Sequence, residues 1–255
     1  MSTMQTVAAT VVSLSVLVLL SGPARAVTAE SQAHTKKGIA LYNQGKVNEA
    51  IGEFRKAIEL DPANADYHNN LSAVLQESGK LDEALKEAQL SIKFRPGSAT
   101  GQANLGNLLL AVKRYAEAES RYRQAIKLAP QNAQYHSNLA IALKQQKKPG
   151  EAEQEYRQAL KLKPRDVETI ILLTTLLRDQ HQKEEADKQA HLAVKYGPNN
   201  PDAHLVLANV LKDAHKDSEA LQEYQTVLKL KPDHSSAAQI KDYIEFLKNR
   251  PDARI

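Results

Sequence analysis

The sequence predicts an all-α protein built as a stack of short helix pairs. The main evidence is a period of 34 residues, at which prolines return along the 255-residue chain without a single insertion. A period of this length is typical of a solenoid of repeated helical units. Apolar residues also recur at helical spacing, as Leu139 and Leu143 do before Tyr156 and Leu160, so each helix has one stripe to bury. The periodic prolines are Pro62, Pro96, Pro130, Pro164, Pro198 and Pro232.

These prolines divide most of the chain into six units. Neither helix of a unit can bury its apolar stripe alone, so neighbouring units are expected to stack. Residues 27–30 precede the first unit as a short linker, and residues 235–255 follow the last as a capping helix and tail. The predicted units are 31–64, 65–98, 99–132, 133–166, 167–200 and 201–234.

Two positions within the unit carry only small side chains, which predicts that the two helices of a unit cross closely there. Position 20 is Ala in every unit: Ala50, Ala84, Ala118, Ala152, Ala186 and Ala220. Position 8 is occupied by Gly38, Ser72, Gly106, Ala140, Thr174 and Ala208.

The ends of the helices are also predicted by residue type. The last position of a unit holds a side chain that can cap the next helix, in Asn64, Ser98, Asn132, Asp166 and Asn200. Position 19, near the start of the second helix, is Glu in every unit, where a negative charge favours the helix dipole. In the capping helix, the residues that share one apolar face are Ile240, Tyr243, Ile244 and Leu247.

This pattern resembles the tetratricopeptide repeat (TPR) family, whose motif has small residues at positions 8, 20 and 27, large apolar residues at 7, 11 and 24, and Pro at 32. The third unit matches with Leu105, Gly106, Leu109, Ala118, Tyr122, Ala125 and Pro130, and the fourth with Leu139, Ala140, Leu143, Ala152, Tyr156, Ala159 and Pro164. Lys37, Ala88 and Ala190 depart from it. The resemblance implies a right-handed α-solenoid of helix-turn-helix repeats, whose first helices line a concave groove and bind polypeptides.

Composition and charge argue against several functional classes. The net charge of +4 is too small to indicate nucleic-acid binding, and the absence of cysteine excludes disulfides and Cys-ligated zinc. The chain contains no nucleophile elbow, no phosphate-cradling glycine loop and no zinc-binding helix motif. We therefore expect no enzymatic activity and no cofactor.

Four histidines share position 4 of their units and are candidate metal ligands. They are His34, His68, His136 and His204. Because they belong to different helices, and only the first two lie in adjacent units, half-buried packing is favoured over a metal site.

The first 26 residues predict export. An apolar run from Val7 to Leu20 leads to Ser21 and then to Ala24-Arg25-Ala26, which is the form of a secretory signal peptide cleaved after Ala26. The alternative is an uncleaved membrane anchor over residues 7–22, although the 14-residue run is short for a bilayer that needs about 20 residues.

The resemblance assigns positions 2, 5, 6, 9, 12 and 13 to the concave surface. Asn occupies position 6 in three successive units, as Asn70, Asn104 and Asn138, and Asn107 stands at position 9. A primary amide both donates and accepts hydrogen bonds, so such a ladder can pair with the backbone of an extended peptide. The alternative is that Asn is merely tolerated on a solvated helix surface.

Beyond these amides the same surface becomes apolar. Positions 5 and 6 of the last two units hold Ile171, Leu172, Leu205 and Val206. An exposed apolar cluster suggests a partner site, and packing against the next unit is the alternative.

The sequence thus predicts an exported, periplasmic or secreted adaptor or assembly factor that binds a protein or peptide partner in the groove. The alternative is a membrane-tethered scaffold that self-associates. A protein that regulates an enzyme on another chain would show the same sequence pattern. The identity of the partner, the pathway and the oligomeric state are not encoded in any motif.

Overall fold

The computed structural model describes residues 23–248, and over this range the chain forms thirteen helices joined by short turns and loops, with no strand. The predicted all-α class is therefore confirmed. The chain divides into two compact units, Met1–Arg114 and Tyr115–Ile255. The predicted signal peptide or anchor lies almost entirely outside the described residues.

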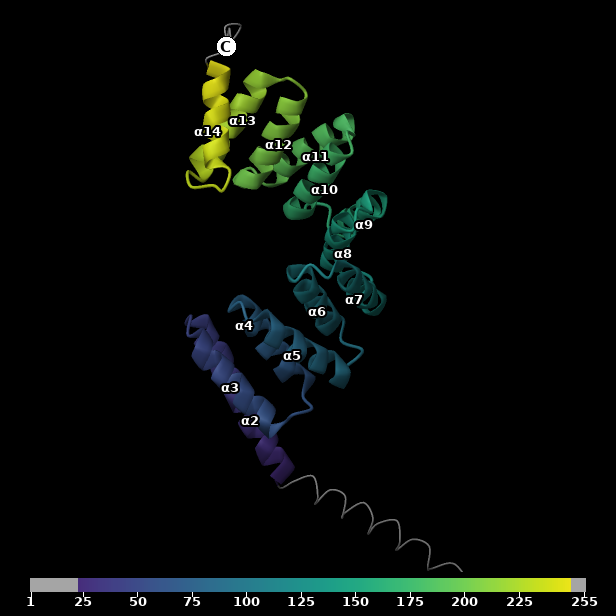
Figure 1. The fold of residues 1–255 in the computed structure, drawn as a ribbon, viewed down its shortest axis with the longest axis vertical. Coiled ribbons are helices and arrows are strands. Elements are labelled where there is room, and N and C mark those ends of the chain that lie inside the picture. The colour runs from purple at the N-terminus through teal and green to yellow at the C-terminus, as the bar shows by residue number, and fades with distance from the viewer. Residues whose placement is uncertain (1–22, 249–255) are drawn as a thin grey trace, which may run out of the picture. The chain divides into compact units, whose positions relative to one another are not determined.

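Unit 1 consists of antiparallel helix pairs and one further helix. In Figure 1, α2 lies beside α3 and α4 beside α5, while α6 packs on α5. Residues 27–30, expected to form a linker, lie within α2. The helices are α2 (Pro23–Asn43), α3 (Val47–Leu60), α4 (Ala65–Glu77), α5 (Leu81–Phe94) and α6 (Ala99–Ala111).

Unit 2 repeats the same arrangement. The pairs are α8 with α9, α10 with α11 and α12 with α13, and the predicted capping helix α14 packs on α13 (Figure 1). Ile240 and Leu247 are the buried residues of α14. The helices are α7 (Tyr115–Leu128), α8 (Ala133–Gln145), α9 (Pro149–Leu162), α10 (Val167–Asp179), α11 (Lys183–Tyr196), α12 (Pro201–Asp213), α13 (Asp217–Leu230) and α14 (Ala237–Lys248).

The close helix crossing predicted at positions 8 and 20 is present. Every position-20 alanine is at most 1% exposed. At Gly38, an added Cβ atom would lie 2.9 Å from Cε1 of Phe54 on the partner helix, a separation that real Cβ atoms do not tolerate. The small side chains therefore set the distance between the two helices of a pair.

The predicted N-caps are confirmed at all five sites. The side chain of each cap accepts a hydrogen bond from a backbone N–H in the first turn of α4, α6, α8, α10 or α12. Pro201 follows the cap Asn200 at the first helical position, where its missing N–H costs nothing.

The glutamates at position 19 also bond to the preceding helix pair, a role that the sequence did not reveal. Three of them accept from an arginine at position 25 of the previous repeat, with N–O distances of 2.7 to 3.4 Å. These side chains are largely solvated, so each pair adds little stability by itself. The pairs are Arg55–Glu83, Arg123–Glu151 and Arg157–Glu185.

The turn inside each helix pair requires a left-handed backbone at position 15. Gly45 and Gly79 meet this requirement with φ of 75° and 77°, whereas the other four turns use a side-chain-bearing residue at φ between 58° and 62°. These four are Lys113, Lys147, His181 and His215. An L-residue in this conformation costs roughly 1 kcal/mol relative to glycine.

We predict that Gly79→Ala lowers the free energy of unfolding by about 1 kcal/mol, because alanine resists the left-handed conformation. Apart from Gly79 and its two chain neighbours, no atom lies within 4 Å of the added methyl group, so a clash with another part of the fold cannot be the cause. Gly52→Ala is the matched control, since Gly52 lies inside α3, also with nothing within 4 Å. It is expected to raise stability by about 0.5–1 kcal/mol. Urea denaturation measures both changes, and equal effects at the two sites would contradict the argument.

Candidate functional site

Each of the four position-4 histidines pairs with a glutamate of the same helix pair, a contact called here the interlock. In each, Nδ1 lies 2.5 to 2.7 Å from a carboxylate oxygen of the glutamate nineteen residues later, on the second helix of the same pair. The pairs are His34–Glu53, His68–Glu87, His136–Glu155 and His204–Glu223.

Three of these histidines also form a hydrogen bond to the preceding repeat. Their Nε2 atoms lie 2.9 to 3.2 Å from the backbone carbonyl oxygens of Pro62, Pro130 and Pro198. A carbonyl oxygen can only accept, so Nε2 donates there, and both hydrogen bonds of one ring form with an ionised glutamate only when both nitrogens carry protons. Each such ring ties together two helices and the loop that precedes them.

The expectation that these histidines pack half-buried is met for His34, whereas His68, His136 and His204 are fully buried and hydrogen-bonded. The sequence does contain evidence for this His–Glu pairing, but it is visible only when the six repeats are compared with one another. Position 23 is Glu in each unit whose position 4 is His, and it is Arg121 or Gln189 where position 4 is Gln102 or Ile170.

Among the described side chains, no group of three or more His, Asp or Glu residues could hold a metal ion. A search of residues 23–248 likewise finds no helix with both the length and the hydropathy needed to cross a bilayer.

In unit 1, the predicted amides lie half-exposed on the first helices α4 and α6, which are neighbours. Asn104 donates a hydrogen bond from Nδ2 to Oδ1 of Asn69, at 2.8 Å, which links the two helices. Asn70, one residue after Asn69, makes no side-chain hydrogen bond to any residue in the described range. Asn107 is half-exposed on the same helix as Asn104. Unit 1 thus presents several amide groups on one pair of first helices.

In unit 2, Asn138 is half-exposed on α8 and accepts a hydrogen bond from Nε2 of Gln134, one turn earlier, at 2.8 Å. The apolar candidates divide into two groups. Ile171, Leu172 and Leu205 are half-buried, whereas Val206 is only 4% exposed.

Val206 belongs to an apolar cluster with Ile170, Ala193 and Ala203, and Ile171 packs against this cluster. For Val206 the packing alternative therefore holds, and it is removed from the candidate surface. The reason is that α10 and α12 lie side by side, so a position-6 side chain on α12 enters the space between them.

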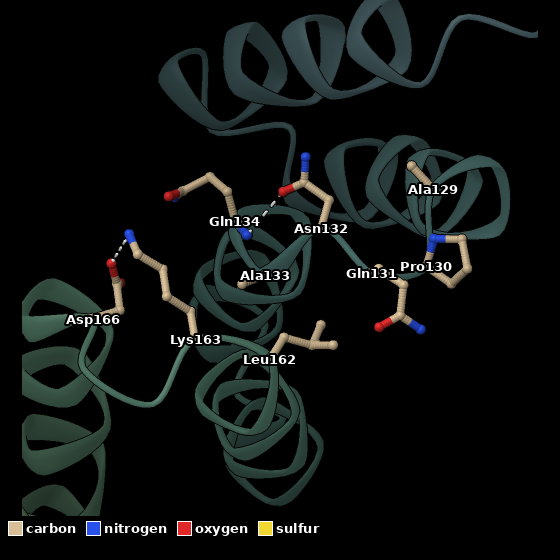
Figure 2. A pocket seen from close by; sticks show the side chains of 9 residues that line it. All are labelled: Ala129, Pro130, Gln131, Asn132, Ala133, Gln134, Leu162, Lys163 and Asp166. Carbon is tan, nitrogen blue, oxygen red and sulfur yellow. Dashed lines mark hydrogen bonds and ion pairs between the residues drawn. The ribbon is translucent and has the colours of Figure 1, made fainter.

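A cavity of about 710 Å³ in unit 2 lies where helix ends meet (Figure 2). In Figure 2, Lys163 points to the carboxylate of Asp166, and Asn132 accepts from the backbone N–H of Gln134. The polar groups of Asn132, Lys163 and Asp166 are thus engaged in bonds at the ends of the helices. Its lining residues are Ala129, Pro130, Gln131, Asn132, Ala133, Gln134, Leu162, Lys163 and Asp166.

Helix pairs with small crossing residues, capped first helices and a regular period define a helical repeat protein. Comparison with known families identifies the kind of repeat. Residues 38–79 match the family described as "TPR repeat" and residues 104–167 match "Tetratricopeptide repeat". Residues 38–79 and 104–167 thus carry tetratricopeptide repeats, and proteins with such repeats are generally non-catalytic modules that bind protein or peptide partners.

Solved structures with the same fold include three TPR-like chains. The Pseudomonas aeruginosa pilF structure is 23% identical, with a TM-score of 0.72, and the match covers 85% of this chain and 99% of that one. The TPR protein YrrB is 22% identical with a TM-score of 0.56, covering 74% and 97%. The TPR protein TTC0263 from Thermus thermophilus is 21% identical with a TM-score of 0.58, covering 71% and 98%. At these identities the likeness shows the fold alone. No curated protein sequence matches the chain.

Stability is predicted to depend on the ionised Glu53 carboxylate at low pH. The hydrogen bond from His34, together with those from Lys56 and Lys37, lowers the pKa of Glu53 to about 2, although burial acts in the opposite direction. Because the folded pKa is below the ordinary 4.5, the contribution is complete above about pH 4.5 and is lost as the pH falls towards 2. Melting temperatures of wild type and Glu53→Gln should therefore differ at pH 6 and converge near pH 2.

The control for this measurement is Glu59→Gln in the same helix α3, since Glu59 is exposed and forms no ion pair with a described residue. A gap between wild type and Glu53→Gln that stays constant from pH 6 to pH 2 would contradict the prediction.

The buried His68–Glu87 pair is predicted to be energetically coupled. His68→Gln should destabilise by roughly 1–3 kcal/mol, because it disturbs a buried histidine that bonds to both Glu87 and Pro62. A double-mutant cycle with Glu87→Arg copies the residues that the third repeat has at these positions, Gln102 and Arg121. We expect a coupling of about 0.5–3 kcal/mol in urea denaturation, and strictly additive effects would rule out the interlock.

Proposed function

We propose that this protein is a non-catalytic binding protein that holds an extended polypeptide segment against the exposed amides of its first helices, and that it acts as an exported adaptor or assembly factor. The observation that carries the proposal is the pair of neighbouring helices α4 and α6. Their position-6 amides, Asn70 and Asn104, stay half-exposed although the surrounding helix faces are buried.

The chemistry of the amides supports recognition of a peptide backbone. The Asn69–Asn104 hydrogen bond uses one donor hydrogen of Asn104 and one acceptor lone pair of Asn69, so both amides keep capacity for further bonds. Asn70 keeps all of its capacity among the described residues. A carbonyl and an N–H of an extended chain can satisfy such groups whatever its side chains are.

Two further observations agree with this proposal. One of the similar solved structures, YrrB, is described as a TPR protein with an unusual peptide-binding site, which is a property of that protein. Within unit 2, the half-buried Ile171, Leu172 and Leu205 offer a separate apolar contact for a polypeptide partner. Export is proposed from the apolar run Val7 to Leu20 and the small residues that follow it.

The test is a pull-down from the protein's own cells with the full chain, beside a variant in which Asn70, Asn104 and Asn138 are changed to Ala. Each lost hydrogen bond costs about 1 kcal/mol, so the variant should bind the partner roughly 100-fold more weakly. The matched control changes Asn48, Gln154 and Asn199 to Ala, which are exposed amides that lie outside the first helices.

A partner that is captured by the wild type and the control but not by the variant would support the proposal. A partner retained equally by the wild type, the variant and the control would show that the binding surface does not include these amides. Self-association as the sole interaction would favour the tethered scaffold instead.

A further inference from the structure

A second cavity of unit 2, of about 580 Å³, lies where α10, α11 and α12 meet α14. Its apolar wall is formed by Val210, Tyr243 and Phe246, and Phe246 is 56% exposed, the most exposed large apolar side chain in the described chain. The Tyr243 and Phe246 rings stack with centroids 6.2 Å apart. The volume is in the range that holds a small ligand or a few side chains.

The charges around this cavity are unevenly paired. Each of its three aspartates interacts with another group: Asp213 with Arg178 at 2.8 Å, Asp217 with the Tyr243 hydroxyl at 3.1 Å and Asp187 with His191 at 3.5 Å. Lys183 and Lys212 form no ion pair with any residue of the described range. The lining as a whole is neutral, because Arg178, Lys183 and Lys212 balance Asp187, Asp213 and Asp217, but Lys183 and Lys212 are the two of these cations that lack an acidic partner.

The position of Lys212 explains why it has no acidic partner. In three earlier repeats, the position-12 side chain bonds to an acid at position 13 of the next repeat: Tyr42 to Glu77, Lys144 to Asp179 and Arg178 to Asp213. At the corresponding sequence position after the last repeat, α14 has Leu247 instead of an acid, and that side chain is buried. Lys212 lies instead over the Tyr243 ring, with Nζ 4.8 Å from the ring centroid.

A smaller cavity of about 110 Å³ adjoins the first, because Lys212 and Tyr243 line both. Its wall also includes Leu205 and Gln239, so it extends the same surface along α12 and α14. The combined surface, called here the α14 cleft, presents aromatic rings beside an unpaired ammonium group.

We propose that the α14 cleft binds a segment of a partner protein that carries a large apolar side chain next to an aspartate or glutamate. The apolar side chain occupies the larger cavity against Phe246, and the carboxylate pairs with Lys212. Burial of apolar surface contributes the affinity, while the charge pair selects acidic segments. The inference depends on the proposed function, since it adds a second contact for a polypeptide partner.

The experiment pans phage-displayed random peptides against the full chain. Enriched peptides are expected to pair an acidic residue with Phe, Trp, Leu or Met. Their affinity, measured by fluorescence anisotropy, should fall about tenfold or more in Lys212→Glu and in Phe246→Ser. It should also weaken as salt is raised, because Lys212 is exposed.

Two controls match these variants. Lys229→Glu makes the same charge change in the last turn of the neighbouring helix α13, away from the cavity, and should alter affinity less than about twofold. Leu128→Ser removes another exposed apolar side chain, which is 44% exposed on α7, and should have no effect.

The outcomes separate this inference from the proposed function. Peptides that need Asn70 and Asn104 but tolerate Lys212→Glu would overturn the α14 cleft and leave the proposed function standing. Enriched peptides without an acidic residue would overturn the stated partner chemistry. A library from which nothing is enriched would count against both proposals.

Discussion

Each helix pair in this protein depends on a close crossing that only small side chains permit. The alanines at position 20 are buried, and the opposite position is never larger than threonine. At Gly38 even one extra carbon would collide with Phe54. Because the crossing is repeated at a fixed period, the first helices within one unit present the same repeat positions on the same face. In unit 1 this places the half-exposed amides of α4 and α6 on neighbouring helices.

The buried, hydrogen-bonded histidines stabilise the contact between a helix pair and the loop that precedes it. A buried ring such as His68 bonds to the second helix through Glu87 and to the preceding loop through Pro62. Leaving such a group unpaired in the interior is costly, so each ring restricts how a pair sits on the loop that precedes it. The arginine and glutamate pairs along the second helices act in the same direction, but in solvent, where they contribute less.

The fold could be predicted from the sequence because its causes are local and repeated. Helical spacing, cap residues such as Asn64 and the small residues at positions 8 and 20 each indicate the local structure in which they stand. The partner of His68 could not be found in this way, because Glu87 lies on a different helix and only the comparison of repeats links the two positions. Val206 shows the opposite failure. Its repeat position suggested exposure, and its burial depends on how near α12 lies to α10.

In a chain of near-copies, the residues that determine binding are those that differ between copies at one geometric position. Position 6 holds an amide in the second, third and fourth repeats, and it holds Leu172 and Val206 in the last two, of which Val206 is buried. In three earlier repeats the side chain at position 12, for example Arg178, bonds to an acid of the next repeat. Lys212 has no such acid, because α14 has Leu247 at the corresponding sequence position. The helix that covers the last apolar face therefore also leaves a cation unpaired beside an exposed aromatic ring. One helix thus has two roles, since Ile240 and Leu247 of α14 are buried while Tyr243 and Phe246 of the same helix line the α14 cleft.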